Sequence, residues 1–256
     1  MPPRKYRKSN SPYARPAPAI ATSSAPPQAT GTVTTQSHAP TIDVVTSSPA
    51  PVPPTDATRI TQNLVQDTAD SPRVWLVGSS IIRHAFLHSL TSPMGINLQL
   101  NAQIWWQGYG GLTLKTLQRR INHIANLEDA PSVIVIHCGG NDIGKTQTQK
   151  LLVNVQEVHK FLSLKFPSTK LVWSELLPRI KWRYSNNIRA METTRARINR
   201  QGMRCFLNIG GAIYHPQFKN KDEYLFKVDG VHLSKEGNEI FCQNLKSGLQ
   251  QFLKKC

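Results

Sequence analysis

The stretch SVIVIHC, residues 132–138, is the most continuously apolar part of the chain, and the turn signal GGND, residues 139–142, follows it directly. An apolar run of this length, rich in β-branched residues and closed by glycines, is typical of a strand that is buried on both faces. Such strands occur mainly in parallel sheets, where helices cover each side. The stretch therefore predicts a central strand of a parallel sheet.

Similar apolar runs lie on both sides of this strand in the sequence and alternate with helical patterns. In the predicted helix near residues 149–166, for example, Leu151, Val155 and Leu162 recur at helical spacing. Strands that alternate with helices form parallel sheets with right-handed crossovers. We therefore predict an α/β fold, a flavodoxin-like three-layer α/β/α sandwich with a five-stranded parallel sheet. The other strands are expected at residues 74–77, 98–106, 170–173 and 212–214, and the other helices near 81–90, 114–127, 187–206 and after Ser234.

Four short motifs fall at the carboxyl ends of these strands or just before the last helix. Because the carboxyl ends of parallel strands meet at one edge of the sheet, we expect the motifs to converge there. Three of the motifs have an ordinary explanation when taken alone, since the first two suit plain turns, with Ser80 as a helix N-cap, and Asp-x-x-His pairs are commonly surface turns. The third is the most specific, because a plain turn would not need two glycines and an amide at the mouth of a central strand. The motifs are GSS at 78–80, GYGG at 108–111, GGND at 139–142 and DGVH at 229–232.

The side chains of these motifs are those that nucleophilic catalysis needs. Ser80, at a strand-to-helix turn, has its hydroxyl at the positive end of a helix dipole. Asp229 can accept the Nδ1–H of His232, which leaves the other ring nitrogen free to take a proton from a nucleophile. The apolar residues around this pair predict a strand-like segment. A glycine N–H of the second motif and the amide of Asn141 can stabilise an oxyanion.

The four motifs, in this order, resemble the blocks of the SGNH (GDSL-type) hydrolase superfamily over roughly residues 73–254. The resemblance implies a flavodoxin-like fold and the cleavage of acyl or acetyl esters, thioesters or acetylated sugars, with no metal or organic cofactor. The positions that match the family's functional residues are Ser80, Asp229 and His232 for the catalytic triad, and Asn141 and Gly111, with Gly110 as the nearby alternative, for the oxyanion hole.

The sequence departs from the family pattern at two positions. The family's first block is Gly-Asp-Ser, whereas Ser79 replaces the aspartate here. That carboxylate normally helps to hold the loops around the serine, so its loss suggests a looser oxyanion hole and a slower enzyme. The change also leaves Ser79 as an alternative to Ser80 for the reactive hydroxyl. Leu112 follows Gly111 where relatives often have Asp, which alters the rim of the site.

Residues 1–70 differ sharply in composition from the rest of the chain. They hold 12 of the 18 prolines and almost no aromatic residues, so we expect a disordered basic leader that cannot bury enough apolar surface to fold. One SGNH hydrolase-type domain is expected over residues 71–256. The leader has 6 basic and 4 acidic side chains, which leaves +14 of the net charge of +16 on the domain. A domain this basic is expected to attract polyanions, RNA or DNA first.

A basic and aromatic segment follows the fourth predicted strand, at the same edge of the sheet as the four motifs. Its residues Arg179, Lys181, Trp182 and Arg183 suit contact with a phosphate backbone, with single-stranded nucleic acid or with the rim of a substrate site. The alternative is a solvated loop that covers the pocket. The predicted helix that follows is also rich in arginine.

A narrower likeness also exists in two segments. Residues 74–83 and 171–179 are similar to SGNH-like domains carried by vertebrate retroelements, including tyrosine-recombinase retrotransposons. Two functions therefore stay open. One is a serine hydrolase that acts on a small ester, and the other is a weakly active or inactive retroelement module that binds nucleic acid through its basic surface.

The remaining composition bears on the compartment of the protein. No apolar run reaches the length of a membrane span, and the first residues lack the apolar core of a signal peptide. The four cysteines are widely spaced, which argues against a zinc site and for reduced thiols. We expect an intracellular protein in the cytoplasm, with the basic residues 4–8 as a weak signal for nuclear import. The ester and the oligomeric state stay open.

Overall fold

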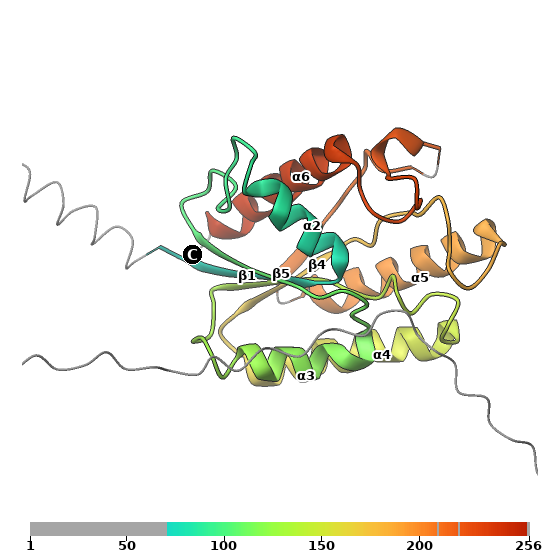
Figure 1. Ribbon diagram of the computed structural model, residues 1–256. Coiled ribbons are helices and arrows are strands. Elements are labelled where there is room, and N and C mark those ends of the chain that lie inside the picture. Colours follow the sequence, from blue (N-terminus) through green and yellow to red (C-terminus); the bar gives the residue numbers. More distant parts are fainter. Residues whose placement is uncertain (1–70, 209, 220, 255–256) are drawn as a thin grey trace, which may run out of the picture. The chain divides into compact units, whose positions relative to one another are not determined.

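The computed structural model describes residues 71–208, 210–219 and 221–254 (Figure 1). The disorder predicted for the leader, residues 1–70, lies outside the described residues. The division of the chain into this leader and a domain over residues 71–256 therefore stays a prediction.

Five parallel strands form one sheet in the described part of the chain. The strand order is β2-β1-β3-β4-β5, which is the flavodoxin-like order. The predicted central strand, β3, is buried along its whole length and pairs with β1 and β4. The predicted fold class is thus confirmed. The strands are β1 (Arg73–Gly78), β2 (Gln103–Gly108), β3 (Val133–His137), β4 (Lys170–Ser174) and β5 (Gly210–Ile213).

Helices cover both faces of the sheet (Figure 1). Successive side chains of a strand point to opposite faces. In β1, Val74 and Leu76 therefore pack with α2 and α6, whereas Trp75 and Val77 pack with α3, α4 and α5. None of the described helices is long and apolar enough to cross a membrane. The helices are α2 (Ser80–Ser89), α3 (Leu114–Ile124), α4 (Thr148–Lys165), α5 (Ile188–Phe206), α6 (Lys235–Leu253) and a short 3₁₀ helix, η1 (Glu223–Leu225).

Two predicted segments differ from the structure. The second strand is expected from Leu98 but begins at Gln103, because Leu98 and Gln99 have φ angles of 52° and 53° that a strand does not accommodate. The segment that holds the Asp-x-x-His motif is not strand-like. Residues 228–232 form turns and bends, and Val228 is 94% exposed, so its apolar side chain does not mark a buried strand.

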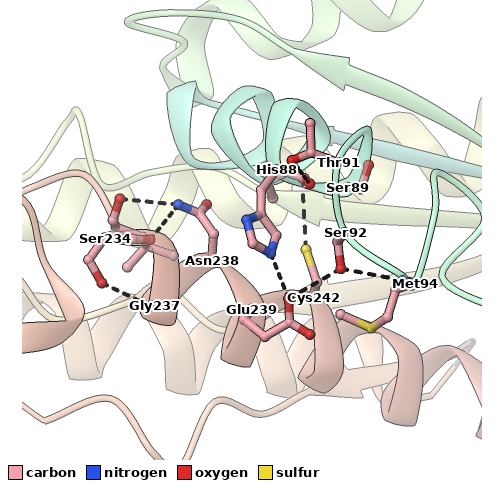
Figure 2. A network of polar contacts seen from close by, with 12 residues as sticks. His88, Ser89, Thr91, Ser92, Met94, Ser234, Gly237, Asn238, Glu239 and Cys242 are labelled. Carbon is pink, nitrogen blue, oxygen red and sulfur yellow. Dashed lines mark hydrogen bonds and ion pairs between the residues drawn. The ribbon is translucent and has the colours of Figure 1, made fainter.

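Polar contacts join α2 to α6 (Figure 2). The carboxylate of Glu239 on α6 accepts hydrogen bonds from Nε2 of His88 at 2.7 Å and from the hydroxyl of Ser92 at 3.2 Å. Helix α2 begins at Ser80, and α6 begins shortly after His232. These contacts therefore hold together the two elements that carry the candidate nucleophile and the candidate base.

We expect Gly78→Ala to lower the free energy of unfolding by about 2 kcal/mol or more. A Cβ at Gly78 would lie 2.6 Å from the carbonyl oxygen of His137 and 2.4 Å from Cγ1 of Ile82. The carbonyl of His137 belongs to β3 and cannot shift without disturbing the sheet. We therefore expect the substitution to displace the start of α2. Urea denaturation of the full chain measures the loss.

Gly110→Ala is the matched control, because a Cβ at Gly110 meets no heavy atom within 4 Å. Its free energy of unfolding is expected to stay within about 0.5 kcal/mol of the unsubstituted chain. Equal losses for the two substitutions would contradict the close contact at Gly78.

Candidate active site

Ser80 is the first residue of α2, directly after the turn that ends β1. Its hydroxyl and its backbone N–H lie at the positive end of the helix, where the first N–H groups have no acceptor within the helix. Ser79 is the N-cap residue, is 5% exposed and makes no capping hydrogen bond with its hydroxyl. Of the two serines that the sequence leaves open, Ser80 is the one that contacts His232.

A tight turn before α6 holds Asp229 and His232. One carboxylate oxygen of Asp229 accepts two backbone N–H groups of the turn, each at 2.9 Å. Gly230 has a φ of +66°, and its carbonyl accepts the N–H groups of Ile180 and Lys181 at 2.9 and 3.2 Å. The turn is therefore stabilised by its own hydrogen bonds and attached to the loop that follows β4.

The three side chains form a continuous chain of hydrogen bonds. Nδ1 of His232 lies 2.6 Å from Oδ2 of Asp229, and Nε2 of His232 lies 2.9 Å from Oγ of Ser80. Desolvation alone would raise the pKa of Asp229, but hydrogen bonds from the ring of His232 and from the backbone of the turn lower it to about 2. Asp229 is therefore ionised at neutral pH, so Nδ1 of His232 carries a proton and Nε2 can accept one from the serine.

His84 also contacts the site, although none of the four motifs points to it. Its ring stacks on the ring of His232, with centroids 4.7 Å apart and planes 14° apart, and Nζ of Lys227 lies 3.5 Å from its Nδ1. Burial, and then the electrostatic interactions with His232 and with the ammonium of Lys227, lower the pKa of His84. The neutral ring of His84 packs against the ring of His232. The signal in the sequence is the four-residue spacing from Ser80, which places both side chains on one face of α2.

Gly111 and Asn141 lie on the loops that follow β2 and β3, at the same edge of the sheet as Ser80. Gly111 has a φ of +71°, a conformation that glycine adopts without strain. The side chain of Asn141 donates through Nδ2 to the carbonyl of Leu112 at 3.0 Å and accepts through Oδ1 from Arg179 at 3.1 Å. These contacts fix the orientation of the amide and leave the second Nδ2 hydrogen for a substrate oxygen.

Asp142 connects the loop after β3 with the segment that follows β2. The sequence alone does not indicate this contact. Asp142 is 4% exposed, and its Oδ2 accepts the N–H of Leu114, the first residue of α3, at 3.1 Å. The loop that carries Asn141 is thereby bonded to the helix that follows the loop of Gly111. Burial raises the pKa of Asp142 to about 6, although the N–H of Leu114 and the charge of Lys145 act in the opposite direction.

The loop after β4 holds the basic and aromatic segment noted in the sequence. Arg179 is partly buried, and its guanidinium lies 5.2 Å over the ring of Trp182. Trp182 is 7% exposed, so its indole is not available to stack on a nucleic-acid base. Lys181 and Arg183 are exposed, and Nζ of Lys181 donates to the carbonyl of Val228 at 3.3 Å. Of the four residues, Trp182 is therefore buried, Arg179 is partly buried, and Lys181 and Arg183 are exposed.

A second serine–histidine contact lies in the interior of the fold. Oγ of Ser174 is 2.9 Å from Nε2 of His215 and 3.0 Å from Nδ1 of His137. The three residues are at most 3% exposed, and burial lowers the pKa of both histidines. A substrate does not reach this cluster, so we assign it to the packing of the core.

The arrangement at the edge of the sheet combines a serine hydroxyl, a histidine base and a separate set of N–H donors. Such a set can deprotonate the hydroxyl and stabilise negative charge on a substrate oxygen. Within the described residues, no group of three or more His, Cys, Asp or Glu side chains is arranged to hold a metal ion.

No protein-family model and no curated protein matches the chain, whereas several solved structures do. A GDSL-like lipase from Bacteroides thetaiotaomicron has a TM-score of 0.56 at 20% identity, over 77% of this chain and 98% of the lipase. A family 3 carbohydrate esterase from Clostridium thermocellum has a TM-score of 0.54 at 17% identity, over 72% and 98% of the two chains. A psychrotrophic esterase from Pseudoalteromonas sp. has a TM-score of 0.54 at 12% identity, over 72% and 99%.

This chain therefore has the fold of the GDSL-like lipases and esterases. The fold that the resemblance to the SGNH superfamily implies is confirmed. The likeness to domains of vertebrate retroelements stays a prediction.

We expect Asp142→Asn to change how stability depends on pH. The pKa of about 6 in the folded chain lies above the ordinary 3.8, so the unfolded chain releases this proton first as the pH rises. The native chain should therefore lose stability relative to the variant between about pH 4 and pH 7, by up to about 3 kcal/mol. Asn keeps an acceptor for the N–H of Leu114. Urea denaturation over this pH range measures the difference, and parallel curves for the two chains would contradict the assignment.

Proposed function

We propose that this chain is a serine hydrolase that cleaves carboxylic esters, acyl or acetyl esters of small molecules, through a Ser-His-Asp triad. The observation that carries the proposal is the unbroken chain of hydrogen bonds from Ser80 through His232 to Asp229. This alignment is the one that activates a serine for nucleophilic attack. The fold adds support, because the solved structures that share it include a lipase and a carbohydrate esterase.

In the first half of the reaction, His232 takes the proton of Ser80 while Oγ attacks the ester carbonyl carbon. Asp229 stabilises the imidazolium that forms. The backbone N–H groups of Ser80 and Gly111, together with the second Nδ2 hydrogen of Asn141, stabilise the oxyanion of the tetrahedral intermediate. His232 then protonates the leaving alcohol, and an acyl-enzyme on Ser80 remains.

In the second half, His232 takes a proton from a water molecule, and the water oxygen attacks the acyl carbon. The same donors stabilise the second oxyanion. When this intermediate collapses, His232 returns the proton to Oγ of Ser80 and the carboxylic acid leaves. The neutral ring of His84, stacked on His232, helps to keep the base aligned through both halves.

Ser79 stands where the SGNH pattern Gly-Asp-Ser has an aspartate. Other contacts must therefore hold the loops around the nucleophile in this chain. The bond from Arg179 to Asn141 and the bond from Leu114 to Asp142 connect the loops after β2, β3 and β4. We infer that these contacts maintain the oxyanion hole, so the chain retains hydrolytic activity.

The basic surface favours a second proposal, contact with RNA or DNA, which would fit a retroelement module of weak or absent hydrolase activity. Arg195 serves the fold, since it pairs with Glu192 at 2.7 Å and donates to the carbonyl of Leu176. Binding through phosphates would weaken steeply with salt and would not require Ser80. The exposed arginines of α5 that form no ion pair with described residues are Arg189, Arg197, Arg200 and Arg204.

Ser80→Ala is expected to reduce kcat for hydrolysis of p-nitrophenyl acetate by the full chain to background, a loss on the order of 10⁶-fold. Asp229→Asn should reduce kcat by about 10⁴-fold, because a neutral amide does not hold the tautomer of His232 that accepts the serine proton. The release of p-nitrophenolate measures both effects.

Ser79→Ala is the matched control, because its buried hydroxyl makes no contact with His232. This variant should retain hydrolysis. Activity that survives in Ser80→Ala and disappears in Ser79→Ala would overturn the assignment of the nucleophile. A folded chain that hydrolyses no ester but binds RNA in a salt-sensitive manner would favour the second proposal.

A further inference from the structure

A cationic hollow of about 220 Å³ lies beside the proposed oxyanion donors. Three cations line it, Lys145, Arg179 and Arg183, and none of its lining residues is Asp or Glu. Gly111 and Asn141 line it as well. At about 30 Å³ for each water molecule, the hollow has room for roughly seven waters, which is the size of a short acyl chain with a polar end.

Arg179 is the cation of this hollow that is least exposed to solvent, since Lys145 and Arg183 are both exposed. Its partly buried guanidinium donates to Oδ1 of Asn141, which is a neutral acceptor. The carboxylates of Asp229 and Glu192 attract it, but each forms its ion pair with another side chain. Burial lowers the pKa of Arg179 to about 10, so the group is charged at neutral pH.

The position of the hollow relative to the triad indicates which part of a substrate it would hold. Arg179 and Gly140 also line a narrower hollow that includes the chain neighbours of Ser80 and His232. The cationic hollow itself contains no residue of the turn 229–232. Since His232 protonates the leaving alcohol, we place the alcohol beside that turn and the acyl chain in the cationic hollow, whose lining includes Gly111 and Asn141 but no residue of the turn.

We propose that the preferred substrate is an ester whose acyl chain ends in an anionic group, and that Arg179, Arg183 and Lys145 bind this group. The inference rests on the proposed hydrolase function. A guanidinium binds a carboxylate through paired, charge-assisted hydrogen bonds, so an anionic acyl end would give Arg179 a hydrogen-bonded ion pair in addition to its bond to the neutral Asn141. The same contact would position the ester carbonyl at Gly111 and Asn141.

The test compares two p-nitrophenyl esters with acyl chains of equal length. One is the monoester of adipic acid, which ends in a free carboxylate, and the other is the uncharged hexanoate. For the full chain, we expect kcat/KM for the adipate monoester to exceed that for the hexanoate by about tenfold or more. The ratio of the two values reports recognition of the charge, because both esters share the same leaving group.

A double variant, Lys145→Gln with Arg183→Gln, is expected to lower this ratio by about tenfold. Arg179 is left unchanged because it also orients Asn141. The matched control is Arg200→Gln with Arg204→Gln, which removes two charges from the exposed surface of α5. The control should leave the ratio as it is in the unsubstituted chain.

The outcomes separate this inference from the proposed function. Hydrolysis of the hexanoate that depends on Ser80, with a ratio near one, would overturn the inference and leave the hydrolase proposal standing. If the ratio of the two kcat/KM values falls equally in both double variants, the preference is due to general charge attraction. This result would also overturn the inference. If neither ester is hydrolysed by the folded chain, both proposals fail. If the Lys145 and Arg183 substitutions weaken binding of a single-stranded RNA oligonucleotide but leave the ratio unchanged, the hollow binds nucleic acid instead.

Discussion

The close approach of α2 to the ends of β1 and β2 is the constraint on which the candidate site depends. Gly78 and Gly108 lack the Cβ atoms that would collide with α2 and the neighbouring strand, so the first turn of the helix lies directly against the sheet. This contact puts Ser80 at the carboxyl edge. The hydrogen bonds of Glu239 then hold α6 against α2, and the turn before α6 brings His232 to the serine. Two short motifs that are far apart in the chain thus meet through one helix pair.

The parts of the fold with strong local signals could be predicted from the sequence. The apolar run at residues 132–138 marks the central strand because it is buried on both faces, and the glycines after it mark the turn. The pairing of Asp229 with His232 could be anticipated only because the Asp-x-x-His motif occurs together with three other motifs, since such a pair alone is commonly a surface turn. The start of β2 could not, because the positive φ angles at Leu98 and Gln99 leave no trace in the hydrophobic pattern.

The remaining features of the site arise from contacts between distant segments, which a single sequence does not specify. His84 stacks on the ring of His232, which is far from it in the sequence, and Asp142 accepts a hydrogen bond from the first residue of α3. The basic segment is the clearest case. Its composition predicts a cationic surface, but only the structure separates the partly buried Arg179, beside Asn141, from the exposed Arg183 and from the indole of Trp182 in the interior.

The central claim is that His232 activates Ser80. The most direct measurement is to treat the full chain with a fluorophosphonate probe, which reacts with activated serines, and to locate the adduct by fragmentation mass spectrometry. The contact between Nε2 of His232 and Oγ of Ser80 predicts one adduct, on Ser80, that does not form once the chain is unfolded. An adduct on Ser79, or a folded chain that takes up no probe, would contradict the claim.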